Sequence, residues 1–225
     1  MTTAEQLSLL IPIAYLLGSV PFGLIVGLWK GIDPRKAGSG NIGATNVGRL
    51  LGGRFFALVF ALDCLKGLLP TLAASWVVSR QAGNQGWVTY LLWLLVGFGA
   101  IAGHMFSLFL KFKGGKGVAT SAGVMFGVFP DYTLAAALVV VVFIVCVMAT
   151  RIVSLSSMVG AGVFPLVYVG VALFRGKPVL GERWPLLAFA VLVGLMVIWK
   201  HRTNIKRLMA GTESKITRKE RAKAA

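Results

Sequence analysis

The chain has 225 residues, of which 57% are hydrophobic and only 13% are charged. Soluble proteins average about a quarter charged residues, so stretches this apolar must be solvated by lipid. Lys and Arg number 23 against 7 Asp and Glu, an excess that would indicate nucleic acid in a soluble protein. Here the bases lie between or after apolar runs. The pattern therefore indicates membrane topology and anionic head groups, and it excludes an ordinary soluble domain and a nucleic-acid partner.

Apolar runs of about 20 residues, the length that crosses a bilayer, recur along the chain. They predict membrane helices at 7–29, 55–78, 87–110, 132–150, 155–174 and 184–199. A further run at 118–129 is short and covers roughly 18 Å of a hydrocarbon core of roughly 30 Å. It is either a re-entrant half-helix or a full span that starts below the interface. The first run lacks a basic leader and a cleavage site, so we expect a retained anchor rather than a signal peptide.

The distribution of basic residues decides between these alternatives. With seven spans, most Lys and Arg lie on one side, in 30–54, 111–117, at Arg151 and in the C-terminal segment. The other side then holds Arg80, Arg175, Lys177 and Arg183. If the short run did not cross, the bases would divide evenly. The positive-inside rule therefore predicts an all-α integral membrane protein with seven transmembrane helices, the amino terminus outside and the carboxyl terminus cytoplasmic.

We expect residues 1–213 to form a single seven-helix domain, followed by a basic cytoplasmic tail at 214–225. Nearly all of the unusual polar chemistry lies in the segments predicted to be cytoplasmic, so a site at the cytoplasmic face is expected. Cys64 and Cys146 lie inside apolar runs without metal-ligand spacing, and we interpret them as helix filler. No metal site is expected, because the acidic residues are scattered and the two histidines lack spaced partners.

The first cytoplasmic segment combines glycines, amides and hydroxyls without a hydrophobic period. Glycines permit positive φ and close approach of the backbone to a ligand, and an Arg binds phosphate through two parallel hydrogen bonds. The candidate ligands are Ser39, Asn41, Thr45, Asn46 and Arg49. A flexible loop is the alternative, although such linkers rarely carry two Asn and an Arg in this arrangement.

The second cytoplasmic segment follows the third span. His104, Ser107 and Lys111 are three and four residues apart, so they share one face if the helix continues to its predicted end. The run Lys113-Gly114-Gly115-Lys116-Gly117 then opens the short span. Exposed amides at a helix start, its positive dipole end and a nearby Lys make an anion site. The Walker A spacing is absent, and the alternative for the lysines is positive-inside charge alone.

Two ionisable residues, Asp63 and Lys66, lie inside the second span, one turn apart. Charged groups at such depth are costly and usually face a partner or a polar cavity. The pair either neutralises itself or supports the site from behind.

The last polar groups lie at the ends of the later spans. Ser154, Ser156 and Ser157 follow Arg151, where a helix-capping turn is the alternative interpretation. His201 and Asn204 are three residues apart directly after the last span, and Glu213 follows. Four cytoplasmic segments thus bring phosphate-type ligands to one side. They indicate an anionic partner with more than one phosphate, while the lipid-facing spans would let a long acyl chain enter laterally.

These motifs resemble those of the bacterial acyl-phosphate-dependent glycerol-3-phosphate acyltransferases, the PlsY family. The resemblance rests on 38–46 with Arg49, on Asp63 and Lys66, on 103–107 leading to 112–117, and on 201–204 with 211–213. It covers nearly the whole chain, and the ordered set is specific although each motif alone is weak. The basic extension after Glu213 is treated as variable.

The resemblance implies the first step of phospholipid synthesis in a multi-pass protein of the bacterial inner membrane. A fatty acyl group would pass from acyl phosphate to the sn-1 hydroxyl of glycerol 3-phosphate, giving lysophosphatidic acid and phosphate. No cofactor is expected, and neither acyl-CoA nor acyl carrier protein would be the donor. Neither histidine is followed by the Asp of the His-x4-Asp dyad found in unrelated acyltransferases, since Phe109 and Lys206 occupy those positions.

Residue roles follow from the demand to orient two anions and disperse their repulsion. We expect the 113–117 segment, with Lys116, to hold the donor phosphate. Ser39, Arg49, His201 and Asn204 would then hold glycerol 3-phosphate, with Ser107, Lys111, Ser154 and Glu213 as further binding residues. The proton acceptor is either His104 or His201, which could titrate near neutrality, or the donor phosphate itself.

Two other classes remain as alternatives. A transporter for an organic phosphate also uses helix-end anion sites, but near the bilayer midplane and in repeated halves that are not seen in this sequence. An intramembrane serine protease would need a Gly-x-Ser-Gly motif, which is missing around Ser39. Acyl-chain preference, oligomeric state and the assignment of each phosphate stay open. The tail would contact either lipid or an enzyme that forms the donor.

Overall fold

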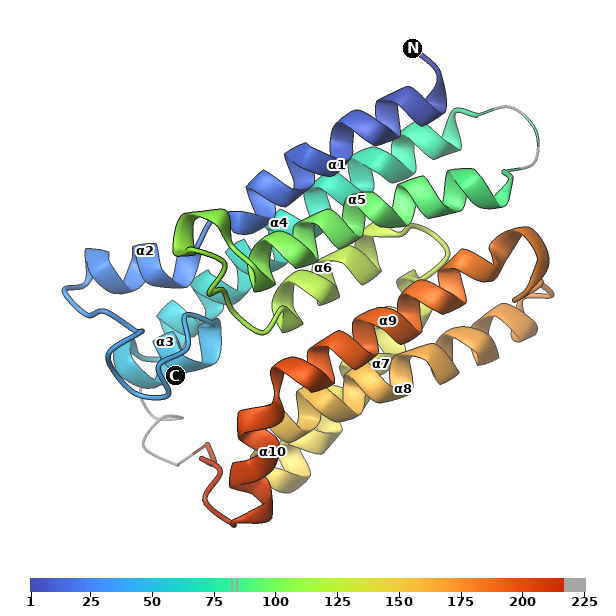
Figure 1. Ribbon diagram of the computed structural model, residues 1–225. Helices are drawn as coiled ribbons and strands as arrows, with labels where there is room; N and C mark the ends of the chain where they lie inside the picture. Colours follow the sequence, from blue (N-terminus) through green and yellow to red (C-terminus); the bar gives the residue numbers. More distant parts are fainter. Residues whose placement is uncertain (82, 84, 217–225) are drawn as a thin grey trace.

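The computed structural model describes residues 1–81, 83 and 85–216, and within them the chain is all-helical (Figure 1). Most of the predicted tail, 217–225, lies outside the described residues. The helices are α1 (Thr3–Ser19), α2 (Phe22–Trp29), α3 (Ala44–Leu51), α4 (Gly53–Ser79), α5 (Trp87–Met105), α6 (Val118–Gly127), α7 (Thr133–Thr150), α8 (Val153–Phe174), α9 (Trp184–Lys200) and α10 (Arg202–Met209). Short 3-10 turns lie at η1 (Leu108–Leu110) and η2 (Gly181–Arg183).

Within the described residues, 6 segments are long and apolar enough to cross a membrane. They are Thr3–Trp29, Gly53–Ser79, Trp87–Leu110, Thr133–Thr150, Val153–Phe174 and Gly181–Lys200. The short run predicted at 118–129 is the ten-residue helix α6, which is too short to belong to this set. An all-helical protein with several membrane-spanning helices is thus confirmed, while seven crossings stay a prediction.

The helices form two groups, visible in Figure 1 as α1, α4, α5 and α6 on one side and α7, α8 and α9 on the other. In the first group α1 packs on α5 and α4 packs on α6, whereas in the second α8 lies between α7 and α9. The groups meet where α5 contacts α9 and where α6 contacts α7.

Close packing in the first group depends on small residues. A Cβ added at Gly18 of α1 would overlap the carbonyl of Ala100 on α5, and one added at Gly123 of α6 would overlap the carbonyl of Cys64 on α4. Lipid tails are as apolar as the helix surfaces, so the hydrophobic effect does not drive helices together in a membrane. Close van der Waals packing does so instead. These glycines therefore allow α1 to pack closely on α5 and α6 to pack closely on α4.

Two of the predicted spans are interrupted, and the two interruptions contact each other. The span at 7–29 is broken between α1 and α2 by Pro21, which lacks an N–H and disfavours helix at Val20. The span at 87–110 stays helical only to Met105. The two breaks are joined, because the Ser107 hydroxyl donates to the carbonyl of Ser19 over 2.6 Å. Lys66 of α4 contacts the first break, where its ammonium donates to the carbonyl of Val20 over 2.8 Å.

Candidate active site

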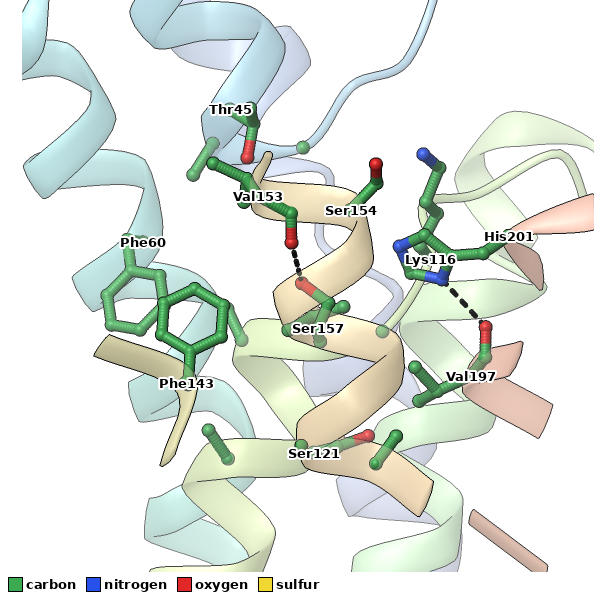
Figure 2. A pocket seen from close by; sticks show the side chains of 18 of the residues that line it. Thr45, Phe60, Lys116, Ser121, Phe143, Val153, Ser154, Ser157, Val197 and His201 are labelled. Carbon is green, nitrogen blue, oxygen red and sulfur yellow. Dashed lines mark hydrogen bonds between the residues drawn. The ribbon is translucent and has the colours of Figure 1, made fainter. Parts of the chain in front are cut away.

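A cavity of about 440 Å³ lies between the two helix groups (Figure 2). One end is polar, and in Figure 2 Thr45, Ser154, Lys116 and His201 gather there. The remainder is mainly apolar and is walled by Phe56 and Phe60 of α4, Met125 of α6, Val139, Val140, Phe143 and Ile144 of α7, Phe164 of α8, and Val193 and Val197 of α9. A ligand that fits this shape has an anionic head and a long apolar tail.

Most of the residues predicted from the sequence line this cavity. They are Ser39, Asn41, Thr45, Asn46, Arg49, His104, Lys116, Gly117, Ser154, His201, Asn204 and Glu213. Five others do not line it, namely Ser107, Lys111, Lys113, Gly114 and Gly115. The structure thus brings all four polar segments together, although not every residue in them reaches the cavity.

The first segment folds around the side chain of Asn46, which is buried. Its amide group donates to the carbonyls of Pro34, Ala37 and Asn41, and its Oδ1 accepts from the backbone N–H of Ser39 over 2.8 Å. These bonds use the whole amide, so Asn46 shapes the loop instead of offering free donors to a ligand. Gly38 has φ 60° and its Cα faces Asn46, so the turn requires glycine.

In the second segment, the predicted continuation of the helix beyond Met105 is wrong. Because α5 ends at Met105, His104, Ser107 and Lys111 do not share a helix face. The Ser107 hydroxyl donates a hydrogen bond to the carbonyl of Ser19. Lys111 adopts a left-handed conformation with φ 50° beyond η1. Lys113 also lies outside the cavity lining. Only Lys116 and Gly117 of this basic run reach the cavity, where they precede α6.

Gly114 and Gly115 lie directly against His104. A Cβ on Gly114 would overlap the carbonyl oxygen of His104, and a Cβ on Gly115 would overlap the Nε2 atom of its ring. The Gly115 N–H also donates to the His104 carbonyl over 3.0 Å. The two glycines therefore let the loop pack directly on His104, and their role in binding a phosphate stays a prediction.

Glu213 is the centre of the polar network. Its Oε1 accepts from the Ser154 hydroxyl over 2.7 Å and from the Asn204 amide over 2.6 Å, while its Oε2 pairs with Arg207 over 2.7 Å. Partial burial favours a higher pKa for Glu213, but these three donors hold the pKa below its ordinary value. Glu213 therefore stays ionised and organises donors from α8 and α10.

Lys116 enters the network through a neutral partner, because its ammonium donates to the Asn204 Oδ1. Burial, opposed by Glu213 and reinforced by Arg207 and Arg49, lowers the pKa of Lys116 to about 8. Arg49 approaches from α3 and donates to the backbone carbonyl of Ser214 over 3.3 Å. Among the described residues, neither Lys116 nor Arg49 is in an ion pair. The cavity thus presents two cations that an anionic ligand would neutralise.

His201 is fixed by a bond to its own helix. Its Nδ1 lies 2.7 Å from the carbonyl of Val197, drawn as a dashed line in Figure 2, and a carbonyl can only accept, so Nδ1 carries the proton. Burial, opposed by this hydrogen bond and reinforced by Lys116, lowers the pKa of His201 to about 4. The expectation that His201 titrates near neutrality is therefore wrong. It is neutral at pH 7, and its Nε2 is a hydrogen-bond acceptor.

Sequence reasoning missed several residues of the cavity. Arg207 follows Asn204 by three residues on α10, so helical spacing could have revealed it. Ser121 of α6 also lines the cavity. Ser157, which the sequence already placed among the polar groups after Arg151, lines it as well and donates to the carbonyl of Val153 rather than capping the helix. The capping interpretation of the serines at 154–157 is thus wrong, because all lie inside α8. The apolar residues that wall the cavity could not be found from the sequence, because there they look the same as residues that face lipid.

The fold and site define a multi-pass membrane protein with a cationic pocket that continues into an apolar cavity. Among the described residues, no group of three His, Cys, Asp or Glu side chains could hold a metal ion. The start of α6 adds further positive potential, since Val118 and Ala119 of its first turn line the cavity and their N–H groups lack partners within the helix.

Comparison with known proteins gives the family. The family model described as glycerol-3-phosphate acyltransferase matches residues 8–211. Two proteins named glycerol-3-phosphate acyltransferase, from Trichlorobacter lovleyi and Aquifex aeolicus, are 46% and 41% identical over 202 and 204 residues. The alignments cover 90% of this chain and 93% of the first, and 91% of this chain and 96% of the second. The chain belongs to the glycerol-3-phosphate acyltransferase family, as its motifs indicated.

Solved structures agree with this assignment. The crystal structure of PlsY in its glycerol 3-phosphate form has a TM-score of 0.79 and 38% identity, covering 96% of this chain and 98% of that one. PlsY in its lysophosphatidic acid form has a TM-score of 0.77 and 38% identity, covering 96% and 97%. PlsY is described as an integral membrane glycerol 3-phosphate acyltransferase. The likeness thus extends over the whole fold.

Proposed function

We propose that this chain transfers a fatty acyl group from acyl phosphate to the sn-1 hydroxyl of glycerol 3-phosphate. The products are lysophosphatidic acid and inorganic phosphate. The observation that carries the proposal is the cavity itself, in which Lys116 and Arg49 face the polar end while Phe60 and Phe143 wall the apolar part. Family membership and the two ligand forms of PlsY support the same reaction.

The donor phosphate binds where Lys116 and Gly117 meet the first turn of α6. This place offers a cation, free amide N–H groups and the positive end of a helix dipole to one phosphate. The acyl chain then extends into the apolar part of the cavity, between α4 and α7.

Glycerol 3-phosphate binds beside the donor phosphate at the polar end, since Asn204 contacts Lys116 directly. Arg49 and Ser39 receive its phosphate, and Asn204 and the Nε2 of His201 orient its glycerol hydroxyls. A neutral His201 suits this role because Nε2 accepts a hydrogen bond from a hydroxyl without adding charge. Its pKa of about 4 makes it a weak base.

The chemical step needs little nucleophilic assistance, because acyl phosphate is a mixed anhydride with a good leaving group. The sn-1 oxygen attacks the carbonyl carbon, the bond from that carbon to the phosphate oxygen breaks, and the hydroxyl proton passes to the departing phosphate. The protein supplies orientation and cations that disperse the repulsion of two anions. No protein base is required in this sequence of events.

The topology we propose has seven crossings, with the amino terminus outside, the carboxyl terminus cytoplasmic and the cavity at the cytoplasmic face of the inner membrane. The contacts of α6 support it. Before α6, Lys116 bonds to Asn204, whereas after it Asp131 pairs with Arg183 at the far end of the bundle. Cysteine labelling in intact cells tests the topology, since a cysteine at Gly83 should react from outside and one at Thr212 should not.

The reaction is tested with purified protein in detergent, given acyl phosphate with and without glycerol 3-phosphate. We expect phosphate release that depends on both substrates, with lysophosphatidic acid formed in equal amount. Release without an acylated product would exclude the transferase, and vesicle uptake of glycerol 3-phosphate without any product would indicate a transporter instead. A donor-forming enzyme as a partner of the tail is a separate proposal, tested by co-purification with and without 217–225.

A further inference from the structure

The apolar part of the cavity ends at a floor of aromatic side chains. Phe164 of α8 lines the cavity, and its ring meets the Tyr132 ring edge-on, with 5.2 Å between the centroids. Tyr168 packs edge-on against the same tyrosine at 5.1 Å, and the Tyr132 hydroxyl donates to the carbonyl of Leu186 on α9. Phe164, Tyr132 and Tyr168 are 5%, 0% and 1% exposed. The floor is thus a packed aromatic cluster that joins the start of α7 to α8 and α9.

The depth of the cavity follows from the two helices that wall it. Figure 2 shows α8 passing along the cavity from Ser154 through Ser157. From Ser154 at the polar end to Phe164 at the floor, about ten residues of α8 rise about 15 Å. On the facing wall, His201 and Ala190 are about 16 Å apart by the same rise. Half of the hydrocarbon core of a bilayer is also about 15 Å, so the cavity is as deep as the layer that one leaflet's acyl chains fill.

Small residues keep this depth open. Gly160 of α8 and Gly194 of α9 line the cavity between its polar end and its floor. A Cβ added at Gly194 would meet the carbonyl oxygen of Ala161 at 2.7 Å, which is backbone. Gly160 is buried, and a Cβ added there would meet a side-chain atom, the Cγ1 of Val139, at 3.3 Å. Gly160 is therefore the position where a side chain can narrow the cavity without a clash against backbone.

We propose that the acyl chain of the donor continues down the cavity to Phe164, whose ring sets the longest chain that the enzyme accepts. This assignment rests on the proposed function and names the feature of the donor that the site selects, which is chain length. The other way out is sideways into lipid, past Phe56, Phe60 and Ile144, which line the cavity and are 37%, 39% and 48% exposed. A chain on that path would leave the deep part unfilled, and the lining there would lose the van der Waals contacts that a chain supplies.

Gly160→Leu tests the path of the chain. Gly160 precedes Phe164 by about one helical turn, so a leucine there should close the lowest 6 Å or so, roughly the rise of four residues. An extended chain with bonds of about 1.5 Å advances roughly 1.3 Å per carbon, so the preferred donor should become about five carbons shorter. In a homologous series of acyl phosphates, kcat/KM for the donor that the wild type prefers should fall roughly 10- to 10²-fold. Donors about five carbons shorter should stay within about threefold of the wild type.

Gly162→Leu is the matched control on the same helix. Gly162 is exposed and lies outside the cavity lining, and a Cβ added there would meet the Cδ1 of Ile198 at 3.9 Å, an ordinary contact. The substitution adds the same volume and the same helix propensity as Gly160→Leu, but on the outer face of α8. We expect kcat/KM to stay within about threefold of the wild type at every chain length, with the preferred donor unchanged.

Shortening the floor residue should have the opposite effect. Phe164→Ala deepens the cavity, so kcat/KM for donors that are too long for the wild type should rise roughly tenfold. Phe164→Leu should raise it less, and it keeps an apolar side chain against Tyr132, so it tests the floor even if the alanine variant does not fold. Thermal unfolding in detergent and size exclusion show which variants are folded.

The profile of kcat/KM against chain length decides the outcome. A shift to shorter donors in Gly160→Leu, absent in Gly162→Leu, is the expected result. An equal loss at every chain length in a folded Gly160→Leu variant would overturn the proposal. The same profile in both glycine variants would also overturn it, because a chain that leaves sideways does not contact the floor.

Failure of the proposed function looks different. A folded wild-type protein that makes no lysophosphatidic acid at any chain length would contradict the transferase. The same variants would then be compared by the rise in Tm that a homologous series of alkyl phosphates causes on binding. A Gly160→Leu profile shifted to shorter chains supports the floor at Phe164, and an unshifted profile overturns it.

Discussion

Charged clusters lie at both ends of the molecule, but their charges are balanced differently. At the end away from α10, Asp131 lies 2.9 Å from Lys177 and 2.6 Å from Arg183, which also donates to the Tyr90 hydroxyl. At the cavity end, Glu213 pairs with Arg207, whereas Lys116 contacts a neutral amide. The first cluster satisfies its cations with a carboxylate, and the second leaves two cations for a ligand.

The difference separates a structural cluster from a binding site. Both clusters contain Arg, buried carboxylate and hydroxyl groups, so composition alone does not distinguish them. What distinguishes them is a cation without a counter-ion among the described residues, beside a cavity large enough for its anion. Mutations at the cavity end should therefore change activity, and mutations at the other end should change stability.

The largest effect is expected for Lys116→Ala. Losing the cation that faces the donor phosphate should lower kcat/KM for acyl phosphate roughly 10²- to 10³-fold, the usual cost of one electrostatic contact to a reacting group. Lys113→Ala is the control, because Lys113 lies in the same basic run but outside the cavity lining. Comparable losses for both lysines, measured by lysophosphatidic acid formation, would contradict the site as built.

The pH dependence of kcat/KM tests the same lysine without removing it. A pKa of about 8 means that Lys116 carries its charge below pH 8 and loses it above. We expect kcat/KM, which reports the free enzyme, to be level below pH 8 and to fall about tenfold per unit above it. Lys116→Arg should abolish this fall, since Arg stays protonated. An unchanged fall in that variant would assign the titration elsewhere.

His104→Gln should cost much less than Lys116→Ala, roughly tenfold in kcat/KM. If the donor phosphate takes the proton, the histidine only supports the loop by packing on Gly115, and Gln retains part of its volume. Assays of both variants with the same substrates make the comparison. A loss for His104→Gln equal to that of Lys116→Ala would instead make His104 the base.

The sequence predicted the helices and the gathering of polar segments, because apolar runs and positive-inside charge are local signals. It could not predict that Ser107 and Lys111 turn away. Helix α5 ends early where the Tyr15 hydroxyl donates to the Phe106 carbonyl and the Ser107 hydroxyl donates to the Ser19 carbonyl. Both contacts join residues about 90 positions apart, so no local pattern reports them.

The same limit explains Asn46 and Gly115. Each looks like a ligand residue in sequence, since amides and glycines are common around phosphates. The Asn46 amide instead donates to three backbone carbonyls, and Gly115 makes room for the His104 ring. The sequence gives the residue types of the site, while the partners that consume some of them are set by tertiary packing.

The smallest effect on activity is expected for Asp131→Asn, at the satisfied end. Activity at 25 °C should stay within about twofold, while removing the carboxylate leaves Arg183 buried without its partner and should cost about 3 kcal/mol of stability. For a chain of this size that lowers Tm in detergent by roughly 6–12 °C. Lys177→Gln should lower Tm far less, because the Lys177 side chain is 38% exposed and solvent screens its pair. A large loss of activity in Asp131→Asn at unchanged Tm would show that the two ends are coupled, and the distinction between satisfied and unsatisfied charge would not hold.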